Sequence, residues 1–95
     1  MTGSVRSSEG LSERQRRLLF RSWHRGIRET DLIMGQFADA HIDTLNDTEL
    51  DAYERLMDVR DADLFAWVTG EQTPPQEYDT ALFRRLRAFH AMGRR

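Results

Sequence analysis

Apolar residues recur at helical spacing along most of this chain, and no stretch shows the alternation typical of a half-buried strand. The pattern predicts a first helix over residues 11–24, which starts at a capping box formed by Ser12 and Gln15. Its expected apolar residues are Leu19, Phe20, Trp23 and Ile27. A second helix is predicted over residues 31–45, with one inward stripe of Met34, Phe37, Ala38, His41, Ile42 and Leu45.

Two further helices begin and end at recognisable capping residues. Asn46 with Glu49 forms a second capping box, which predicts a third helix with an apolar face of Leu50, Tyr53, Leu56 and Met57. Asp61 or Asp63 is expected to start a short fourth helix that is apolar almost all round, and Gly70 to end it.

The last helix is expected to start at Thr73-Pro74-Pro75-Gln76, because proline is tolerated in a first helical turn. Its predicted inward residues are Tyr78, Leu82, Leu86 and Phe89. Short connections favour sequential antiparallel packing, so the predicted fold is all-α, a compact five-helix bundle with a short fourth helix. Residues 1–10 are interpreted as a disordered leader, residues 11–92 as a single helical domain, and residues 93–95 as a frayed C-terminus.

Composition excludes several kinds of chemistry. The chain has no cysteine, which rules out disulfides, thiolate zinc sites and a cysteine nucleophile. All fourteen basic residues are arginine, so no lysine is present for a Schiff base or a phosphate-binding loop. No apolar run approaches the ~20 residues needed to span a bilayer, which predicts no membrane association. The absence of lysine is typical of a GC-rich genome, and from it we infer a bacterial source. We expect a cytoplasmic location.

Charge is unevenly distributed along the chain. Residues 1–30 hold seven arginines and three acids, whereas residues 31–63 hold two arginines and ten acids. Nucleic-acid binding is disfavoured because the acidic middle would repel phosphate. Pairing between helix faces within the fold is the simplest explanation of the segregation, and recognition of a partner protein by complementary charge is the alternative.

Candidate metal and catalytic sites are weak. His24, His41 and His90 lack the spacing that places two ligands on one helix face, so no metal site is expected. Asp58, Asp61 and Asp63 resemble the start of a calcium loop but lack its glycine and its final glutamate. No nucleophile elbow or glycine-rich phosphate loop occurs, and the chain is not expected to be an enzyme.

The most informative segment is Arg25-Gly26-Ile27-Arg28-Glu29, a charged pentapeptide between the first two predicted helices. Glycine within a helix costs about 1 kcal/mol relative to alanine, so its presence needs a reason. In one interpretation Gly26 ends the first helix, Arg25 and Arg28 complement its dipole, and Glu29 favours the start of the second helix. In the other, the segment is a surface that a partner backbone approaches closely.

The residues resemble the succinate dehydrogenase assembly factor family, small helical proteins that promote covalent attachment of FAD to a flavoprotein subunit. The match runs over about residues 14–90. It includes Arg17-Leu18-Leu19-Phe20, Arg25-Gly26-Ile27-Arg28-Glu29, Phe37-Ala38, His41, Tyr53-Glu54-Arg55-Leu56, Asp61-Ala62-Asp63-Leu64-Phe65-Ala66-Trp67, Gly70 and Pro74. Joined in this order and spacing, these motifs are more specific than the R-G-x-x-E pattern alone.

The resemblance implies a five-helix fold and a surface of Arg25, Gly26 and Glu29 that faces the flavoprotein subunit of succinate dehydrogenase or fumarate reductase. We predict that His24 and Arg28 also bind this partner. It implies that FAD is attached to the partner, with no cofactor held stably by this chain, which we expect to be a monomer. His24 and Ile27 depart from the residues most often found there, a basic residue and methionine.

Two other functions are retained as alternatives. One is a small helical regulatory or antitoxin-like module that binds its partner through the acidic middle segment, with Asp47, Asp51, Glu54 and Asp58 as contacts. The other is a flavin-delivery protein that binds FAD itself. The absence of a phosphate-binding loop ranks this last.

Overall fold

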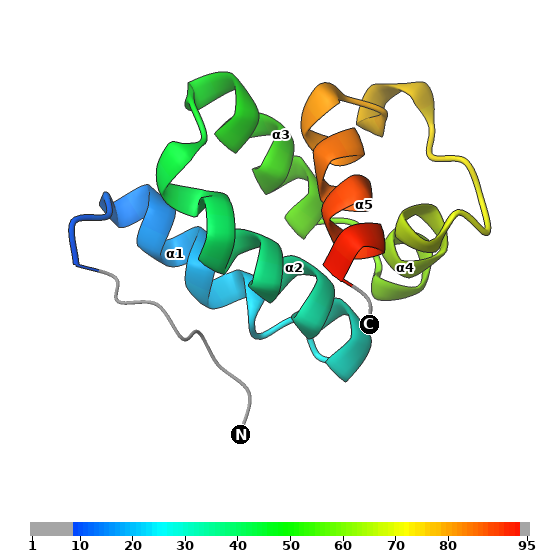
Figure 1. The fold of residues 1–95 in the computed structure, drawn as a ribbon, viewed down its shortest axis with the longest axis horizontal. Helices are drawn as coiled ribbons and strands as arrows, with labels where there is room; N and C mark the ends of the chain where they lie inside the picture. The colour runs from blue at the N-terminus through cyan, green and yellow to red at the C-terminus, as the bar shows by residue number, and fades with distance from the viewer. Residues whose placement is uncertain (1–8, 94–95) are drawn as a thin grey trace. The chain divides into compact units, whose positions relative to one another are not determined.

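A computed structural model describes residues 9–93 of the 95-residue chain. The described residues form five α-helices and two short 3₁₀ turns, with no strand among them, which confirms the all-α prediction (Figure 1). The described residues divide into two compact units, one up to Leu45 and one from Asn46 onward. Of the predicted leader only residues 9 and 10 are described, and residues 94 and 95 of the predicted frayed end are not.

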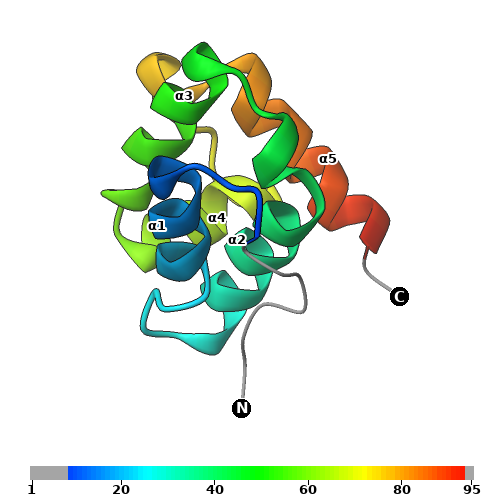
Figure 2. The same cartoon turned by 90° about the vertical axis from the view of Figure 1, so that its left-hand side faces the viewer.

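The first unit contains α1 (Glu13–Ser22), α2 (Arg28–His41) and the 3₁₀ turn η1 (Ile42–Thr44). The predicted capping box is present, with the Gln15 N–H donating to Ser12 Oγ at 3.1 Å and the Ser12 N–H donating to Gln15 Oε1 at 2.8 Å. The helices α1 and α2 lie side by side, and η1 contacts both (Figures 1 and 2).

The end of α1 differs from the prediction. The helix stops at Ser22 with Trp23 as its C-cap, four residues before the boundary expected at Gly26. The last turn tightens there, because the Trp23 and His24 N–H groups donate to the Phe20 and Arg21 carbonyl oxygens at 3.2 Å, and the Trp23 ring packs on Gly35 of α2. The second helix accordingly starts at Arg28, three residues earlier than predicted.

The second unit contains α3 (Asp47–Met57), α4 (Asp61–Thr69), the 3₁₀ turn η2 (Gln76–Tyr78) and α5 (Ala81–Gly93), which contacts both α3 and α4. The Asn46 and Glu49 capping box is present, as predicted. Helix α4 is short and ends at Gly70, whose φ of 86° is left-handed, also as predicted. It starts at Asp61, but the N-cap is Arg60 and no side chain caps it.

The predicted start of the last helix is wrong. Residues 73–76 form a loop that leads into η2, and α5 begins only at Ala81. Thr80, and not Thr73, caps the helix, because the Thr80 hydroxyl accepts the Phe83 N–H at 3.1 Å. Tyr78 therefore lies outside α5, where its ring packs against Trp67 with the centroids 5.3 Å apart.

Most predicted apolar faces are buried. The stripe of α2 is buried apart from His41, which is half-buried, and the predicted face of α3 is buried throughout. Phe65 and Phe89 are half-buried. Phe20 and Ile27 contradict the prediction: their exposed fractions are 62% and 41%. Within residues 9–93 no helix is long and apolar enough to cross a membrane.

Candidate functional site

The candidate site, called here the site segment, is residues 24–29. Residues 24–27 form the connection between α1 and α2, and Arg28 and Glu29 are the first two residues of α2. His24, Gly26, Ile27, Arg28 and Glu29 are exposed, and Arg25 is half-buried. All five residues predicted from the sequence therefore lie together on one short stretch of surface.

The residue before the site segment holds it to the body of the unit. Trp23 is 6% exposed, and its indole packs so closely on Gly35 of α2 that a Cβ built there would lie 2.3 Å from Cδ2. The indole N–H donates to Asp39 Oδ1 at 3.2 Å, so its one polar group is satisfied. Trp23 and Gly35 thus fix the point where the chain leaves α1.

A second anchor lies within the segment. The Arg25 backbone N–H donates to Asp31 Oδ1, with nitrogen and oxygen 2.6 Å apart. The carboxylate reaches back from the first turn of α2, so it closes the connection into a loop of fixed shape. Gly26 follows with a φ of 117°, a backbone conformation that strains any residue with a Cβ. Gly26 therefore shapes the loop and does not cap α1.

The start of α2 completes the segment. Ile27 is its N-cap in extended conformation, without a side-chain cap. Its carbonyl accepts the Asp31 N–H at 3.0 Å and the hydroxyl of the fully buried Thr30 at 3.3 Å. Glu29 and Asp31 lie in the first turn, where a negative charge complements the helix dipole, as predicted for Glu29. Arg28 also lies in the first turn of α2, and the helix dipole disfavours a positive charge at this N-terminal end. Helix stability therefore does not explain why an arginine occupies this position.

Arg28 and Glu29 point their charges at solvent. Both side chains are exposed, and neither forms an ion pair with another residue of the described part of the chain. A guanidinium offers five donors in a planar fork and a carboxylate offers two acceptor oxygens. The surface is thus chemically suited to bind a polar protein surface.

His24 joins the segment to the exposed side of α1. Its ring stacks on that of Phe20, with centroids 3.9 Å apart and planes 16° from parallel. His24 Nδ1 lies 2.6 Å from the Phe20 carbonyl oxygen. Because a carbonyl oxygen only accepts, Nδ1 carries the proton in this contact.

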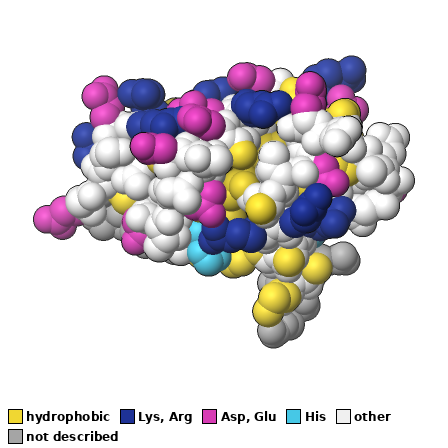
Figure 3. Space-filling view, turned by 90° about the horizontal axis from the view of Figure 1, so that it is seen from above, with side chains coloured by type: hydrophobic (Ala, Val, Ile, Leu, Met, Phe, Trp, Pro, Cys, Tyr) yellow, Lys and Arg dark blue, Asp and Glu magenta, His cyan; other side chains and the backbone are white. Residues whose placement is uncertain are grey.

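The other candidate sites gain no support from the geometry. No group of three or more His, Cys, Asp or Glu side chains able to hold a metal ion occurs among residues 9–93. The acidic residues of the alternative hypothesis lie on α3 or at its C-cap, and Glu49 beside them pairs with Arg85 at 2.8 Å. Arginine and acidic side chains both occur on the face drawn in Figure 3.

Sequence reasoning missed two residues of this site. The sequence pattern indicates Asp31 only as the start of a helix, although an aspartate six residues after Arg25 is within reach of a loop amide. The second residue is Gly35. A glycine inside a predicted helix costs about 1 kcal/mol and signals a close approach, but the sequence does not reveal its partner, Trp23.

Comparison with known proteins gives a consistent result. The family model described as flavinator of succinate dehydrogenase matches residues 16–90. The FAD assembly factor SdhE of Acetobacter pasteurianus is 38% identical over 80 residues, which cover 84% of this chain and 73% of that protein. Succinate dehydrogenase assembly factor 2 of Meyerozyma guilliermondii, a mitochondrial protein, is 41% identical over 64 residues, which cover 67% of this chain and 47% of that protein.

The mitochondrial succinate dehydrogenase assembly factor 2-B of Drosophila ananassae is 36% identical over 85 residues, which cover 87% of this chain and 52% of that protein. This chain therefore spans about half the length of these two mitochondrial relatives. No solved structure matches it. The family match confirms the resemblance carried by the sequence motifs, and the chain belongs to the family of flavinators of succinate dehydrogenase.

Proposed function

We propose that this protein binds the flavoprotein subunit of succinate dehydrogenase and promotes the covalent attachment of FAD to it. The site segment faces that subunit, and the related flavoprotein of fumarate reductase is a second client. The protein acts in the bacterial cytoplasm as an assembly factor. FAD stays on the partner, and this chain holds no cofactor of its own.

One observation supports the proposal most strongly: the exposed charged side chains of the site segment lie on a backbone that hydrogen bonding and packing hold in place. The Arg25 amide is held by Asp31 at 2.6 Å, and the residue before the segment is wedged against Gly35. Arg28 and Glu29 are nevertheless exposed. A loop that is already ordered loses little conformational entropy when it binds, which favours a surface for recognition.

The chemistry of attachment belongs to the partner. A side chain of the flavoprotein forms the bond to the flavin, and the assembly factor favours the conformation in which the two groups meet. Arg25 and Arg28 would donate to carboxylates or carbonyls of the flavoprotein, and Glu29 would accept from its amides. Gly26, which has no side chain, would let the partner backbone come close.

The test compares substitutions in the segment with matched substitutions elsewhere. Arg25→Ala and Glu29→Ala are expected to lower covalent flavin on the flavoprotein, read as in-gel fluorescence, while circular dichroism keeps the wild-type helicity. Arg87→Ala and Glu71→Ala remove an exposed arginine and an exposed glutamate of the second unit, and both should leave flavinylation unchanged.

Two results would contradict the proposal. Normal flavinylation with both segment variants would remove the role of the surface, and loss of helicity would show that the charges serve the fold. The double charge reversal Asp47→Arg/Asp51→Arg on α3 tests the alternative regulatory module. A loss of partner binding with these variants, and not with Arg25→Ala, would favour that alternative.

A further inference from the structure

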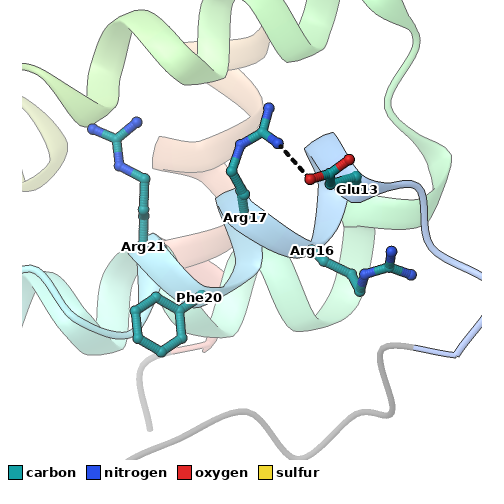
Figure 4. Close-up of a pocket in the computed structure, with 5 residues that line it drawn as sticks. All are labelled: Glu13, Arg16, Arg17, Phe20 and Arg21. Atoms are coloured by element: carbon teal, nitrogen blue, oxygen red, sulfur yellow. Dashed lines mark ion pairs between the residues drawn. The ribbon is translucent and has the colours of Figure 1, made fainter.

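The exposed side of α1 carries two rows of side chains that do not belong to the hydrophobic core of the first unit. Residues four apart lie above one another on a helix. One row is Glu13, Arg17 and Arg21, and the other is Arg16 and Phe20, which continues into His24. Figure 4 shows Arg17 and Arg21 on one side of the helix and Phe20 on the other. Together these six residues are called the α1 face.

Phe20 is the unusual member of the α1 face. Its neighbours Leu18 and Leu19 are buried, but its own exposed fraction is 62%. A benzyl side chain in water loses the free energy that burial would provide, about 25 cal/mol for each Å² of apolar surface. His24 covers only one side of the ring, stacked at 3.9 Å. The ring is thus available as an apolar anchor for another molecule.

The surroundings of Phe20 define what this molecule must carry. Phe20 lines a shallow hollow of about 490 Å³ with Glu13, Arg16, Arg17 and Arg21. Three guanidinium groups against one carboxylate give the hollow a positive charge. Glu13 pairs with Arg17 at 3.6 Å, and both side chains of this pair are mostly exposed, so the pair is weak. An apolar side chain flanked by carboxylates fits both the ring and the arginines.

We infer that the α1 face docks an acidic segment of the flavoprotein, with an apolar side chain of that segment against Phe20. This inference rests on the proposed function and extends it, because His24 belongs both to the α1 face and to the site segment. The α1 face and the site segment are adjacent along the chain and have different functions. The α1 face supplies affinity, and the site segment acts on the flavoprotein once it is bound.

The test measures binding and flavinylation separately. Phe20→Ala and the double charge reversal Arg17→Glu/Arg21→Glu should each weaken the Kd for the purified apo-flavoprotein subunit by about tenfold or more, as expected for an anchor residue at an interface. Flavinylation should return to the wild-type level when the variant is added at saturating concentration. Arg25→Ala, by contrast, should stay defective at saturation.

The chain offers matched controls on α5. Arg84→Glu/Arg87→Glu makes the same charge change and breaks the surface ion pair Arg84–Asp79, as the α1 reversal breaks Arg17–Glu13. Met92→Ala removes an apolar side chain that is 74% exposed. Both controls should bind the flavoprotein like the wild type. Raising the salt concentration should weaken wild-type binding more than binding of the α1 reversal, because exposed charges are screened.

The outcomes separate this inference from the proposed function. If the wild-type protein neither binds the flavoprotein nor raises its flavinylation, the proposed function fails and this inference fails with it. If the wild type does both and the α1 variants bind equally well, only the inference is overturned. Sedimentation of the free protein tests a second copy as the occupant: a wild-type dimer that Phe20→Ala dissociates would overturn the inference.

Discussion

At the scale of single residues, the contact between Trp23 and Gly35 determines where the first helix ends. The Trp23 indole occupies the space where any residue other than glycine at position 35 would have its Cβ. Its N–H is satisfied by Asp39 at 3.2 Å, so burial of the ring leaves no polar group without a partner. This contact places the backbone of the site segment next to the first turn of α2.

We expect Gly35→Ala to destabilise the protein. At an unobstructed helix position this substitution would stabilise by about 1 kcal/mol, because alanine favours helix. Here the new methyl group would overlap the rigid indole, and overpacking of this kind costs about 1–3 kcal/mol. The sign of the change in melting temperature is therefore diagnostic. A rise would contradict the contact, and Trp23→Leu combined with Gly35→Ala should recover part of the loss.

The second residue-scale prediction concerns Asp31. Asp31→Ala removes the acceptor of the Arg25 N–H, so the loop should lose its fixed shape and flavinylation should fall. Asp31→Asn keeps an oxygen at the same place and should retain most of the activity. Equal activity of the two variants, measured as covalent flavin per flavoprotein, would show that the hydrogen bond does not position the segment.

At the scale of elements, local capping chemistry fixes three of the helix starts. The boxes at Ser12 and Asn46 satisfy amides that the helix leaves without partners. Thr80 caps helix α5 by the same physics, but the sequence offers Thr73 as an equally plausible cap. Thr80 is the cap because its hydroxyl meets the Phe83 N–H at 3.1 Å.

The assignment of Thr80 as the N-cap of α5 can be tested by substituting Thr80 and Thr73 in turn. Thr80→Ala should lower the free energy of unfolding by about 1 kcal/mol, a typical cost for loss of an N-cap. For a domain of this size that corresponds to a fall of about 4–8 °C in melting temperature. Thr73→Ala, at an exposed loop position, should change it little. The reverse result would place the start of α5 at Thr73.

At the scale of the whole molecule, the proposed function assigns FAD binding to the flavoprotein and not to this chain. We therefore expect titration of the free protein with FAD to give no saturable quenching of Trp23 or Trp67 fluorescence. Both indoles are buried and so are shielded from collisions with free FAD, which means that saturable quenching would report a bound flavin. Saturable quenching at micromolar FAD would instead favour the flavin-delivery alternative.

Much of this protein follows from its sequence alone. Helical periodicity, two capping boxes and the left-handed Gly70 predict the helices and most of their buried faces, because these signals depend on residues within one or two turns of each other. The motif Arg25-Gly26-Ile27-Arg28-Glu29 and its companions likewise indicate the family, which the comparisons confirm. The site residues themselves stay a prediction.

Only the tertiary structure determines how the site is built. Trp23 ends α1 early because its ring packs on a residue of the next helix, and Asp31 orders the loop from the same helix. Phe20 is exposed although its spacing predicts burial, because the registers of α1 and α2 place Leu18 and Leu19 inside. Periodicity gives the faces of a helix, but the neighbour that packs against it decides which residues of a broad apolar face are buried.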